Sequence, residues 1–261
     1  AGAMACFAAM DASTKLLAAT VPVLMVVWAR NVFQLAVVSA TLLPRRGRAL
    51  LRTRRPGLQL ARAGLLLGTN FTGVIGLGML PLAEFTSIVL LTPLALAAVV
   101  ALTGREPVPP LRWVCVATGL AGGLLVLRPG VHATLAVAGL AVAIVTINTG
   151  YQWLTSRVAQ LEDTGTTQFY TGLIGTVLCT LGLPFAWQAL PAPDWWMLGG
   201  IGLLGLSGHQ LLMYAYARAP VSSLTPLLYL QLAFATVLGV LVFSQRPGAW
   251  ALGGIAGIAA S

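Results

Sequence analysis

The sequence has few charged residues. Only 8% of its 261 residues are Asp, Glu, Lys or Arg, and 58% are hydrophobic. An average soluble domain carries about 25% charged residues, because its surface must meet water. The composition therefore excludes a soluble globule and predicts a protein whose surface meets mostly membrane lipid.

Histidine and cysteine are also scarce. The two histidines are His132 and His209, and the three cysteines, Cys6, Cys115 and Cys179, lie far apart within apolar runs. No CxxC pair or metal-ligand spacing occurs, so free thiols are expected, with no metal and no cofactor. No Walker lysine follows a glycine-rich loop, so ATP-driven pumping has no support.

One motif raises the possibility of an enzyme. Residues 205–208 (GLSG) match the GxSG motif of rhomboid intramembrane proteases. Such a serine needs a histidine base within hydrogen-bond reach. His209 is two positions from Ser207 and points about 200° around a helix, and His132 lies in a short predicted loop. We expect no enzymatic activity, and an intramembrane serine protease is kept only as an alternative.

Positive charge is concentrated in one segment, and the net charge of the chain is +9. The segment Pro44–Arg62 carries seven arginines: Arg45, Arg46, Arg48, Arg52, Arg54, Arg55 and Arg62. Such a cluster can bind nucleic acid, but this one lies between apolar runs. It therefore predicts a cytoplasmic loop between membrane spans and no nucleic-acid partner.

The rest of the chain divides into runs long enough to cross a bilayer as helices, which takes about 20 apolar residues. Ten runs fit: 2–20, 22–43, 63–80, 82–103, 111–128, 133–155, 166–187, 195–217, 221–243 and 249 to the end. The connections are short, so consecutive helices should be antiparallel neighbours. The predicted fold class is an all-α membrane protein with ten transmembrane helices.

Arginine placement predicts the orientation of these spans. If the basic segment is cytoplasmic, the N-terminus is cytoplasmic too, and so are Arg105, Arg112, Arg157 and Arg218. Only Arg128 and Arg246 then fall outside, an asymmetry typical of multi-pass membrane proteins. With an even number of spans, both termini lie in the cytoplasm.

The two halves of the chain resemble each other. Residues 81–107 (PLAEFTSIVLLTPLALAAVVALTGREP) match 220–247 (PVSSLTPLLYLQLAFATVLGVLVFSQRP) at an offset of about 139 residues. Polar positions also align: Asp11 with Asn148, Lys15 with Gln152, Arg30 with Gln168, and Asn70 with His209. A five-helix unit is odd-numbered, so its second copy is inverted. We expect repeats over 1–130 and 131–261, an arrangement that builds secondary transporters with a site at the seam.

Several segments resemble a known family. TKLLAATVPVLMVVWARNVF, LTPLALAAVVALTGREP and GLAGGLLVLRPG are similar to the EamA repeat of the drug/metabolite transporter superfamily, and the resemblance covers both halves. Within the family the chain looks closest to YddG-like amino-acid exporters. The resemblance implies a cavity lined mainly by the first, third, fourth, sixth, eighth and ninth spans. One departure is Ser-Gln-Arg at 244–246, which stands where the first half has Glu106.

Polar and aromatic residues within the spans are the candidate solute contacts, since they suit a small amphipathic solute. They are Asn70, Phe71, Asn148, Tyr151, Gln152, His209, Gln210, Tyr214 and Tyr229. Interhelical hydrogen bonding without solute contact explains any one of them equally well. Their convergence from several spans favours a wet path through the membrane.

Four charged residues form a candidate intramembrane cluster: Asp11, Lys15, Arg30 and Glu84. Asp11 and Lys15 are four residues apart and so share a helix face, where they can pair. Arg30 lies at the depth of Asp11. Charges at that depth are costly unless paired or facing water, so the cluster either ties helices together or contacts the solute. Glu84 can pair with Lys15 or line the outer mouth.

These features predict a secondary transporter of the bacterial inner membrane. We expect a monomer that exports amino acids, including aromatic or other apolar ones, or similar small metabolites. An efflux carrier for drugs is the alternative within the same superfamily. A channel or a sensor is a rival class, but neither needs inverted repeats, whereas alternating access gives them a reason to exist.

Overall fold

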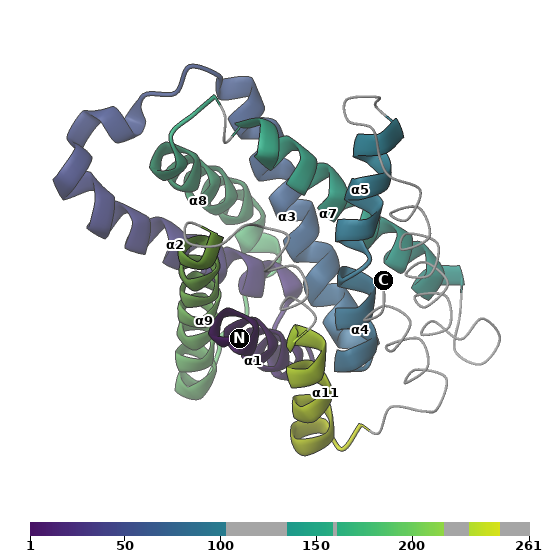
Figure 1. The fold of residues 1–261 in the computed structure, drawn as a ribbon. Helices are drawn as coiled ribbons and strands as arrows, with labels where there is room; N and C mark the ends of the chain where they lie inside the picture. Colours follow the sequence, from purple (N-terminus) through teal and green to yellow (C-terminus); the bar gives the residue numbers. More distant parts are fainter. Residues whose placement is uncertain (103–134, 159–160, 217–229, 246–261) are drawn as a thin grey trace.

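The computed structural model describes residues 1–102, 135–158, 161–216 and 230–245 (Figure 1). Within these residues the regular structure is entirely helical and contains no strand. The helices are α1 (Gly2–Leu17), α2 (Val23–Arg46), the 3-10 helix η1 (Gly47–Leu51), α3 (Pro56–Met79), α4 (Leu82–Val89), α5 (Thr92–Leu102), α7 (Leu135–Val158), α8 (Thr164–Gly182), the 3-10 helix η2 (Leu183–Phe185), α9 (Ala192–Tyr216) and α11 (Leu230–Phe243).

Four segments of the described chain are long and apolar enough to cross a membrane. They are Val23–Arg46, Pro56–Met79, Leu135–Thr155 and Thr164–Phe185. The all-helical class is therefore confirmed for the described residues. The count of ten helices stays a prediction, because the runs 111–128 and 249 to the end lie outside them.

The run 82–103, predicted as one span, is two helices. α4 ends at Val89 and α5 begins at Thr92, with Leu90 and Leu91 between them. Pro93 explains the break: proline has no N–H to donate to the carbonyl of Val89, and its ring clashes with that carbonyl in a continuous helix. The predicted span 82–103 is therefore interrupted before Pro93.

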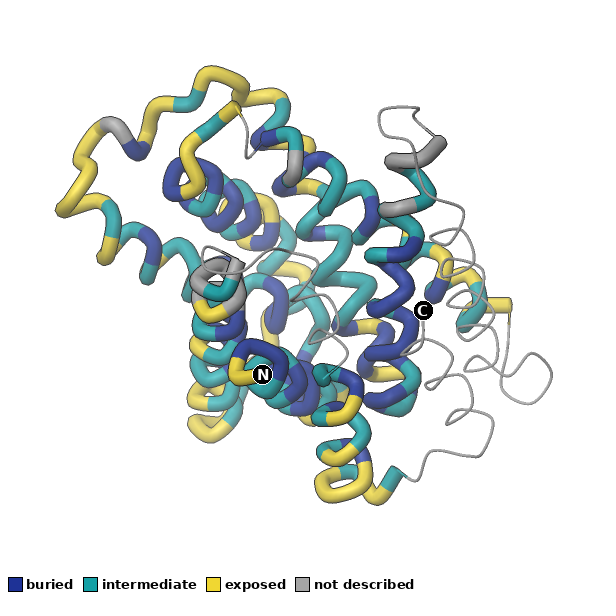
Figure 2. The backbone as a smooth tube through the Cα atoms, viewed as in Figure 1, coloured by how far each residue is buried: buried dark blue, intermediate teal, exposed yellow. Residues whose placement is uncertain are grey.

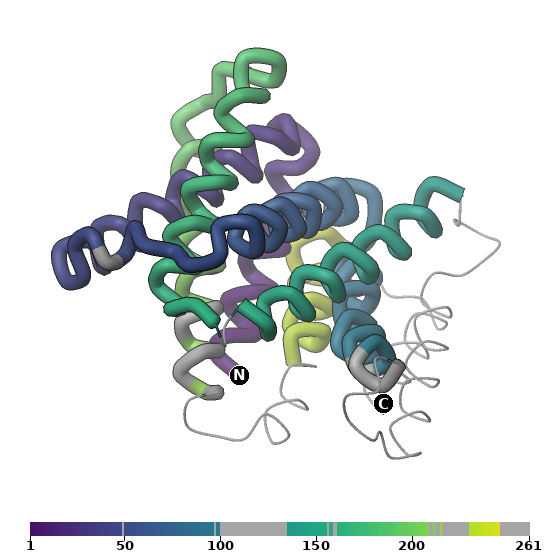
Figure 3. Tube along the Cα trace, turned by 90° about the horizontal axis from the view of Figure 1, so that it is seen from above, coloured from purple at the N-terminus to yellow at the C-terminus, as the bar shows by residue number. Residues whose placement is uncertain are grey.

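Helices from the two halves of the chain pack in pairs. α1 lies against α9, α2 against α8, and α3 against α7 (Figures 1 and 3). Glycines on α9 allow the close approach: a Cβ at Gly202 would lie 2.6 Å from Phe33, and one at Gly208 would lie 2.8 Å from Phe7. Small residues at such contacts are the usual means by which helices associate in lipid.

The outer faces of the helices are apolar. Leu203 on α9, Leu181 on α8 and Leu241 on α11 are 56%, 69% and 75% exposed, and exposed stretches run along the outside of the bundle (Figure 2). Contiguous apolar surface of this kind is unfavourable in water and favourable in lipid. Together with the four apolar segments, it makes the chain a multi-pass membrane protein.

The two ends of α8 differ in chemistry. At its start, Asp163 forms an ion pair with Arg46 at the end of α2. Beyond its other end, Trp187 lies between Trp28 and Trp195, at ring-centroid distances of 6.4 and 6.1 Å. Tryptophan is enriched at the membrane–water interface, so a basic segment marks one face of the bundle and an aromatic cluster marks the other.

Candidate functional site

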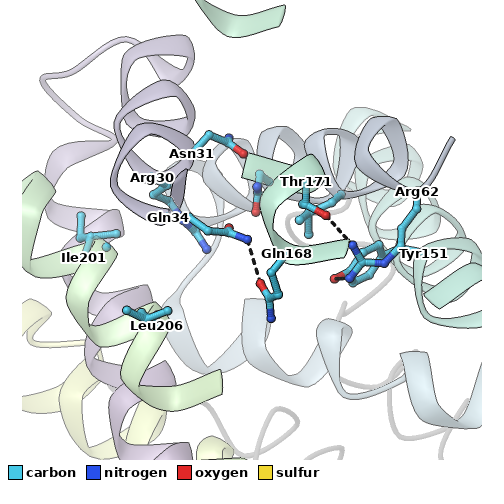
Figure 4. Close-up of a pocket in the computed structure, with 13 residues that line it drawn as sticks. Arg30, Asn31, Gln34, Arg62, Tyr151, Gln168, Thr171, Ile201 and Leu206 are labelled. Atoms are coloured by element: carbon cyan, nitrogen blue, oxygen red, sulfur yellow. Dashed lines mark hydrogen bonds between the residues drawn. The ribbon is translucent and has the colours of Figure 1, made fainter. Parts of the chain in front are cut away.

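A polar cavity of about 110 Å³ lies inside the bundle (Figure 4). Five helices line it: α2, α3, α7, α8 and α9. The polar lining residues are Arg30, Asn31, Gln34, Arg62, Asn70, Tyr151, Gln168 and Thr171, and the others are Leu66, Ile201, Gly202, Gly205 and Leu206. The cavity therefore has a mainly polar wall from α2, α3, α7 and α8, faced by an apolar wall from α9.

Arg62 is the most connected side chain of this cavity. Its Nε donates to Thr155 Oγ1 at 2.9 Å, its Nη1 to Thr171 Oγ1 at 2.6 Å, and its Nη2 to the Tyr151 hydroxyl at 2.9 Å. The guanidinium also lies 5.0 Å from the centre of the Tyr151 ring, within the range of a cation–π contact. Arg62 is only 6% exposed, and these contacts join α3 to α7 and α8.

Arg62 lies in α3 and not in the predicted basic loop. α2 continues to Arg46, η1 follows, and α3 begins at Pro56, so Arg62 lies in the second turn of a helix. Proline at the first position of α3 fits this start, because its missing N–H has no helical partner there. The other six arginines of the segment are exposed.

A spacing in the sequence could have identified Arg62. Arg62, Leu66 and Asn70 are four residues apart in turn, and all three line the cavity. Residues at this spacing share one helix face. A stripe that carries an arginine and an asparagine on an otherwise apolar helix indicates a face turned away from lipid.

Two glutamines meet across the cavity. Gln34 Nε2 on α2 donates to Gln168 Oε1 on α8 at 3.0 Å (Figure 4). Arg30, one turn before Gln34, also lines the cavity. Arg30 and Gln168 are the positions that the sequence comparison of the two halves aligns, and both face the same space.

The predicted solute contacts fall into three groups. Asn70 and Tyr151 line the cavity. Phe71 packs against the core cluster that contains Met25 and Ile201, and Asn148 and Gln152 are partly buried on α7 without lining the cavity. The side chains of His209, Gln210 and Tyr214, and the whole of Tyr229, lie outside the described part of the structure.

The four predicted charges have separate partners. Asp11 accepts from Gln231 Nε2 at 3.1 Å and interacts electrostatically with Arg30, which lines the cavity. Lys15 donates to the carbonyl of Leu77 at 2.6 Å and to that of Leu80, and it interacts electrostatically with Glu84. Lys15 thus binds the last carbonyls of α3, where a cation is favourable. Among the described residues, Asp11 and Lys15 form no ion pair with each other.

The lining helices differ from those that the family resemblance implies. α2 and α8, the second and seventh predicted spans, contribute to the cavity, whereas α1 and α4 contribute no lining residue. Close packing excludes α1: a Cβ at Gly205 would lie 3.0 Å from Met10 Sδ, so Met10 occupies the space beside α9. Gly205 and Gly208, the glycines of the GLSG segment, therefore allow α9 to pack closely against Met10 and Phe7 of α1.

Polar contacts tie the α2–α3 segment to the α7–α8 connection. Glu162 Oε1 accepts from Thr53 Oγ1 and from the backbone N–H groups of Arg54 and Arg55, at 3.0, 2.7 and 2.9 Å. Beside it, the Arg46 guanidinium holds the pKa of Asp163 below its usual range. These contacts join the first and second halves of the chain at the basic face.

The fold and the cavity define a multi-pass membrane protein with a polar site at a junction of helices. Residues 133–261 match the model of the EamA-like transporter family. The match covers slightly less than half of the chain and shows that its second half is similar to membrane transporters of that family.

Two relatives are transporters by name. The chain is 24% identical over 217 residues to a riboflavin transporter of Brucella anthropi, covering 81% of this chain and 76% of the relative. It is 25% identical over 213 residues to an S-adenosylmethionine uptake transporter of Rickettsia felis, covering 77% and 68%. These relatives support small-metabolite transport. They do not support the closer resemblance to YddG-like amino-acid exporters.

The fold also occurs among solved structures. The crystal structure of another protein superposes with a TM-score of 0.69 at 22% identity, over 99% of this chain and 94% of that one. This similarity extends over nearly the whole chain and concerns the fold alone.

Proposed function

We propose that this chain is a secondary transporter of small metabolites, whose solute crosses at the cavity between two inverted halves. The observation that carries the proposal is the position of that cavity. Its lining comes from α2 and α3 of the first half and from α7, α8 and α9 of the second. Inverted-repeat transporters bind their solutes at such a junction.

The helix pairing supports the two halves, 1–130 and 131–261. If α1, α2 and α3 correspond to α7, α8 and α9, the contact of α1 with α9 has its counterpart in that of α7 with α3. The contact of α3 with α8 likewise matches that of α9 with α2, and α2 with α8 is its own counterpart. A two-fold relation between the halves accounts for all of these pairs. The family match also begins at residue 133, close to the proposed boundary.

The size of the cavity supports a cycle of conformations. About 110 Å³ is smaller than the roughly 300–1,000 Å³ of ordinary ligand sites. A metabolite would therefore enter only after the halves separate on one side. The contacts of Glu162 and Asp163 with the α2–α3 segment hold the basic face closed, which fits one state of an alternating-access cycle.

Orientation and location complete the proposal. We propose that this face lies in the cytoplasm of a bacterial inner membrane, with both termini on the same side, because exposed arginines are typical of cytoplasmic loops. The solute class that we propose is a small amphipathic metabolite, either an amino acid with an aromatic or apolar side chain or a compound related to the solutes of the two relatives. The polar and apolar walls of the cavity suit such a molecule.

Counterflow in proteoliposomes tests the function. Vesicles preloaded with unlabelled riboflavin, S-adenosylmethionine or phenylalanine receive a trace of the same labelled solute outside. A carrier gives transient accumulation that saturates with concentration, for at least one solute. A channel gives equilibration without accumulation, and a sensor gives no flux. Vesicles containing heat-denatured protein provide the baseline.

A further inference from the structure

We infer that the transported solute carries an anionic group, a carboxylate, and that Arg62 binds it. This inference rests on the proposed transport function and specifies its solute. It starts from a charge imbalance. Arg30 and Arg62 both line the cavity, and no carboxylate among the described residues does.

The two arginines differ in their surroundings. Arg30 interacts electrostatically with an acidic side chain of the bundle, Asp11. The described residues give Arg62 only neutral partners, the hydroxyls of Thr155, Thr171 and Tyr151. An arginine stays protonated in proteins, and a buried charge without a counter-charge is unfavourable. An anion in the cavity would remove that cost.

The guanidinium also has donors to spare. Arginine has five N–H groups, and the hydrogen bonds use the one on Nε and one on each terminal nitrogen. One N–H therefore remains on Nη1 and one on Nη2. Two donors match the two oxygens of a carboxylate, and charge-assisted bonds of this type are stronger than neutral ones. The existing bonds fix the guanidinium before the solute arrives, which lowers the entropy cost of binding.

The rest of the cavity is consistent with a solute that has one charged end. Gln34 and Gln168 supply neutral amides on the side of α2 and α8, and Ile201 and Leu206 form the apolar side. A purely structural role for Arg62, tying α3 to α7 and α8, is the competing explanation. A structural role predicts that replacing Arg62 lowers the stability of the protein, and that the wild-type protein shows no preference for a solute with a carboxylate.

The test compares acids with counterparts that lack the carboxylate. Binding to the purified chain is measured in detergent for phenylalanine against phenylalaninamide, and for S-adenosylmethionine against its decarboxylated form. We expect at least one acid to bind about tenfold or more tightly than its counterpart without the carboxylate, from the loss of a charged hydrogen bond. Equal binding within both pairs, or no binding by either acid, would overturn the inference.

Variants separate charge recognition from structure. Arg62→Gln should abolish the preference for the acid while leaving binding of the counterpart that lacks the carboxylate, whereas a structural role would weaken both alike. Arg157→Gln is the matched control: Arg157 also lies over a ring, 4.8 Å from the centre of Trp153, but outside the cavity lining. It should keep the preference. If Arg62→Gln does not fold, Arg62→Lys replaces it in the test, because lysine keeps the charge and loses the planar pair of N–H donors. Arg62→Lys should retain only part of the preference for the acid. An unchanged preference would contradict the inference.

Failure of this inference and failure of the transport proposal give different results. Counterflow at equal rates for the acid and for the counterpart that lacks the carboxylate would refute the role of Arg62 and leave the carrier intact. Absence of counterflow for every solute would refute the carrier itself.

Discussion

Asn31 on α2 packs directly against Gly175 on α8, so closely that a Cβ on Gly175 would lie 2.1 Å from Asn31 Oδ1. Asn31 is held in place by donating its Nδ2 to the carbonyl of Val27 at 2.8 Å. The contact leaves no room for a larger residue at position 175. The approach of α2 to α8, which brings Gln34 to Gln168, depends on this glycine.

Gly175→Ala should therefore destabilise the protein. Overpacking of a close contact typically costs about 1–3 kcal/mol, which lowers the thermal midpoint of the purified protein in detergent by several degrees. Gly199→Ala on α9 is the control, because a Cβ there meets nothing within 4 Å. Equal midpoints for the two variants would contradict the proposed close contact of α2 and α8.

Lys15→Met should destabilise the end of α3. The ammonium group donates to the carbonyls of Leu77 and Leu80, and hydrogen bonds from a charged group contribute about 1.5–3 kcal/mol each. Denaturant unfolding in mixed micelles measures the loss. Leu16→Met at the adjacent exposed position provides the control, with a midpoint close to wild type. A Lys15→Met protein as stable as wild type would show that these contacts contribute nothing.

The ion pair of Arg46 and Asp163 should make stability depend on pH. Because Arg46 lowers the pKa of Asp163 in the folded protein, the pair stabilises the fold above the ordinary aspartate pKa of about 3.9. This contribution is lost as the pH falls through the lowered value. Both side chains are nearly half exposed, so the effect should stay below about 1 kcal/mol. Asp163→Asn should remove the pH dependence of this site, measured as the difference in thermal midpoint between wild type and variant across that range.

Asp163 also caps α8 by accepting from the backbone N–H of Thr166 at 3.1 Å. Asparagine keeps this cap, and alanine removes it at a cost of about 1 kcal/mol. Asp163→Ala should thus be less stable than Asp163→Asn at neutral pH. A reversed order would contradict the capping role.

Glu162→Ala should make the cavity more accessible from the basic face. Glu162 holds Thr53, Arg54 and Arg55 beside the α7–α8 connection, and its removal leaves these donors to water. We expect a cysteine at Gln168 to react a few-fold faster with a polar thiol reagent added on that face. Asp194→Ala, an acidic residue at the start of α9, should leave the rate unchanged. An unaltered rate in Glu162→Ala would mean that these contacts do not close the cavity.

Much of the fold follows from the sequence because lipid imposes strong rules. Apolar length and proline positions predicted α1, α2, α7, α8 and α9 to within about five residues at each end, whereas α3 begins at Pro56, seven residues before the predicted start at 63. The break before Pro93 was not predicted, since proline within a span often only bends a helix and the outcome depends on neighbouring contacts.

The site was predicted less completely. Asn70 and Tyr151, two of the candidate solute contacts, line the cavity, and their role as solute contacts stays a prediction. Arg62 was missed because it was grouped with the nearby arginines Arg54 and Arg55, which are exposed. Its shared helix face with Leu66 and Asn70 was therefore not considered. Gln34 and Thr171 were also missed. Their positions in the cavity depend on the approach of α2 to α8, and residue spacing within one helix does not predict that approach.

The central claim is that the solute passes through the cavity between the halves, and thiol blocking of counterflow tests it most directly. Leu206→Cys is introduced after Cys6, Cys115 and Cys179 are replaced by serine, and the protein is treated with a bulky thiol reagent. Leu206 lines the cavity, whereas Leu203 on the same helix is 56% exposed on the outside, so Leu203→Cys is the matched control. We predict that treatment abolishes counterflow in Leu206→Cys, that solute slows the inactivation, and that Leu203→Cys is unaffected. Full counterflow in a Leu206→Cys protein shown by mass to be modified would contradict the account.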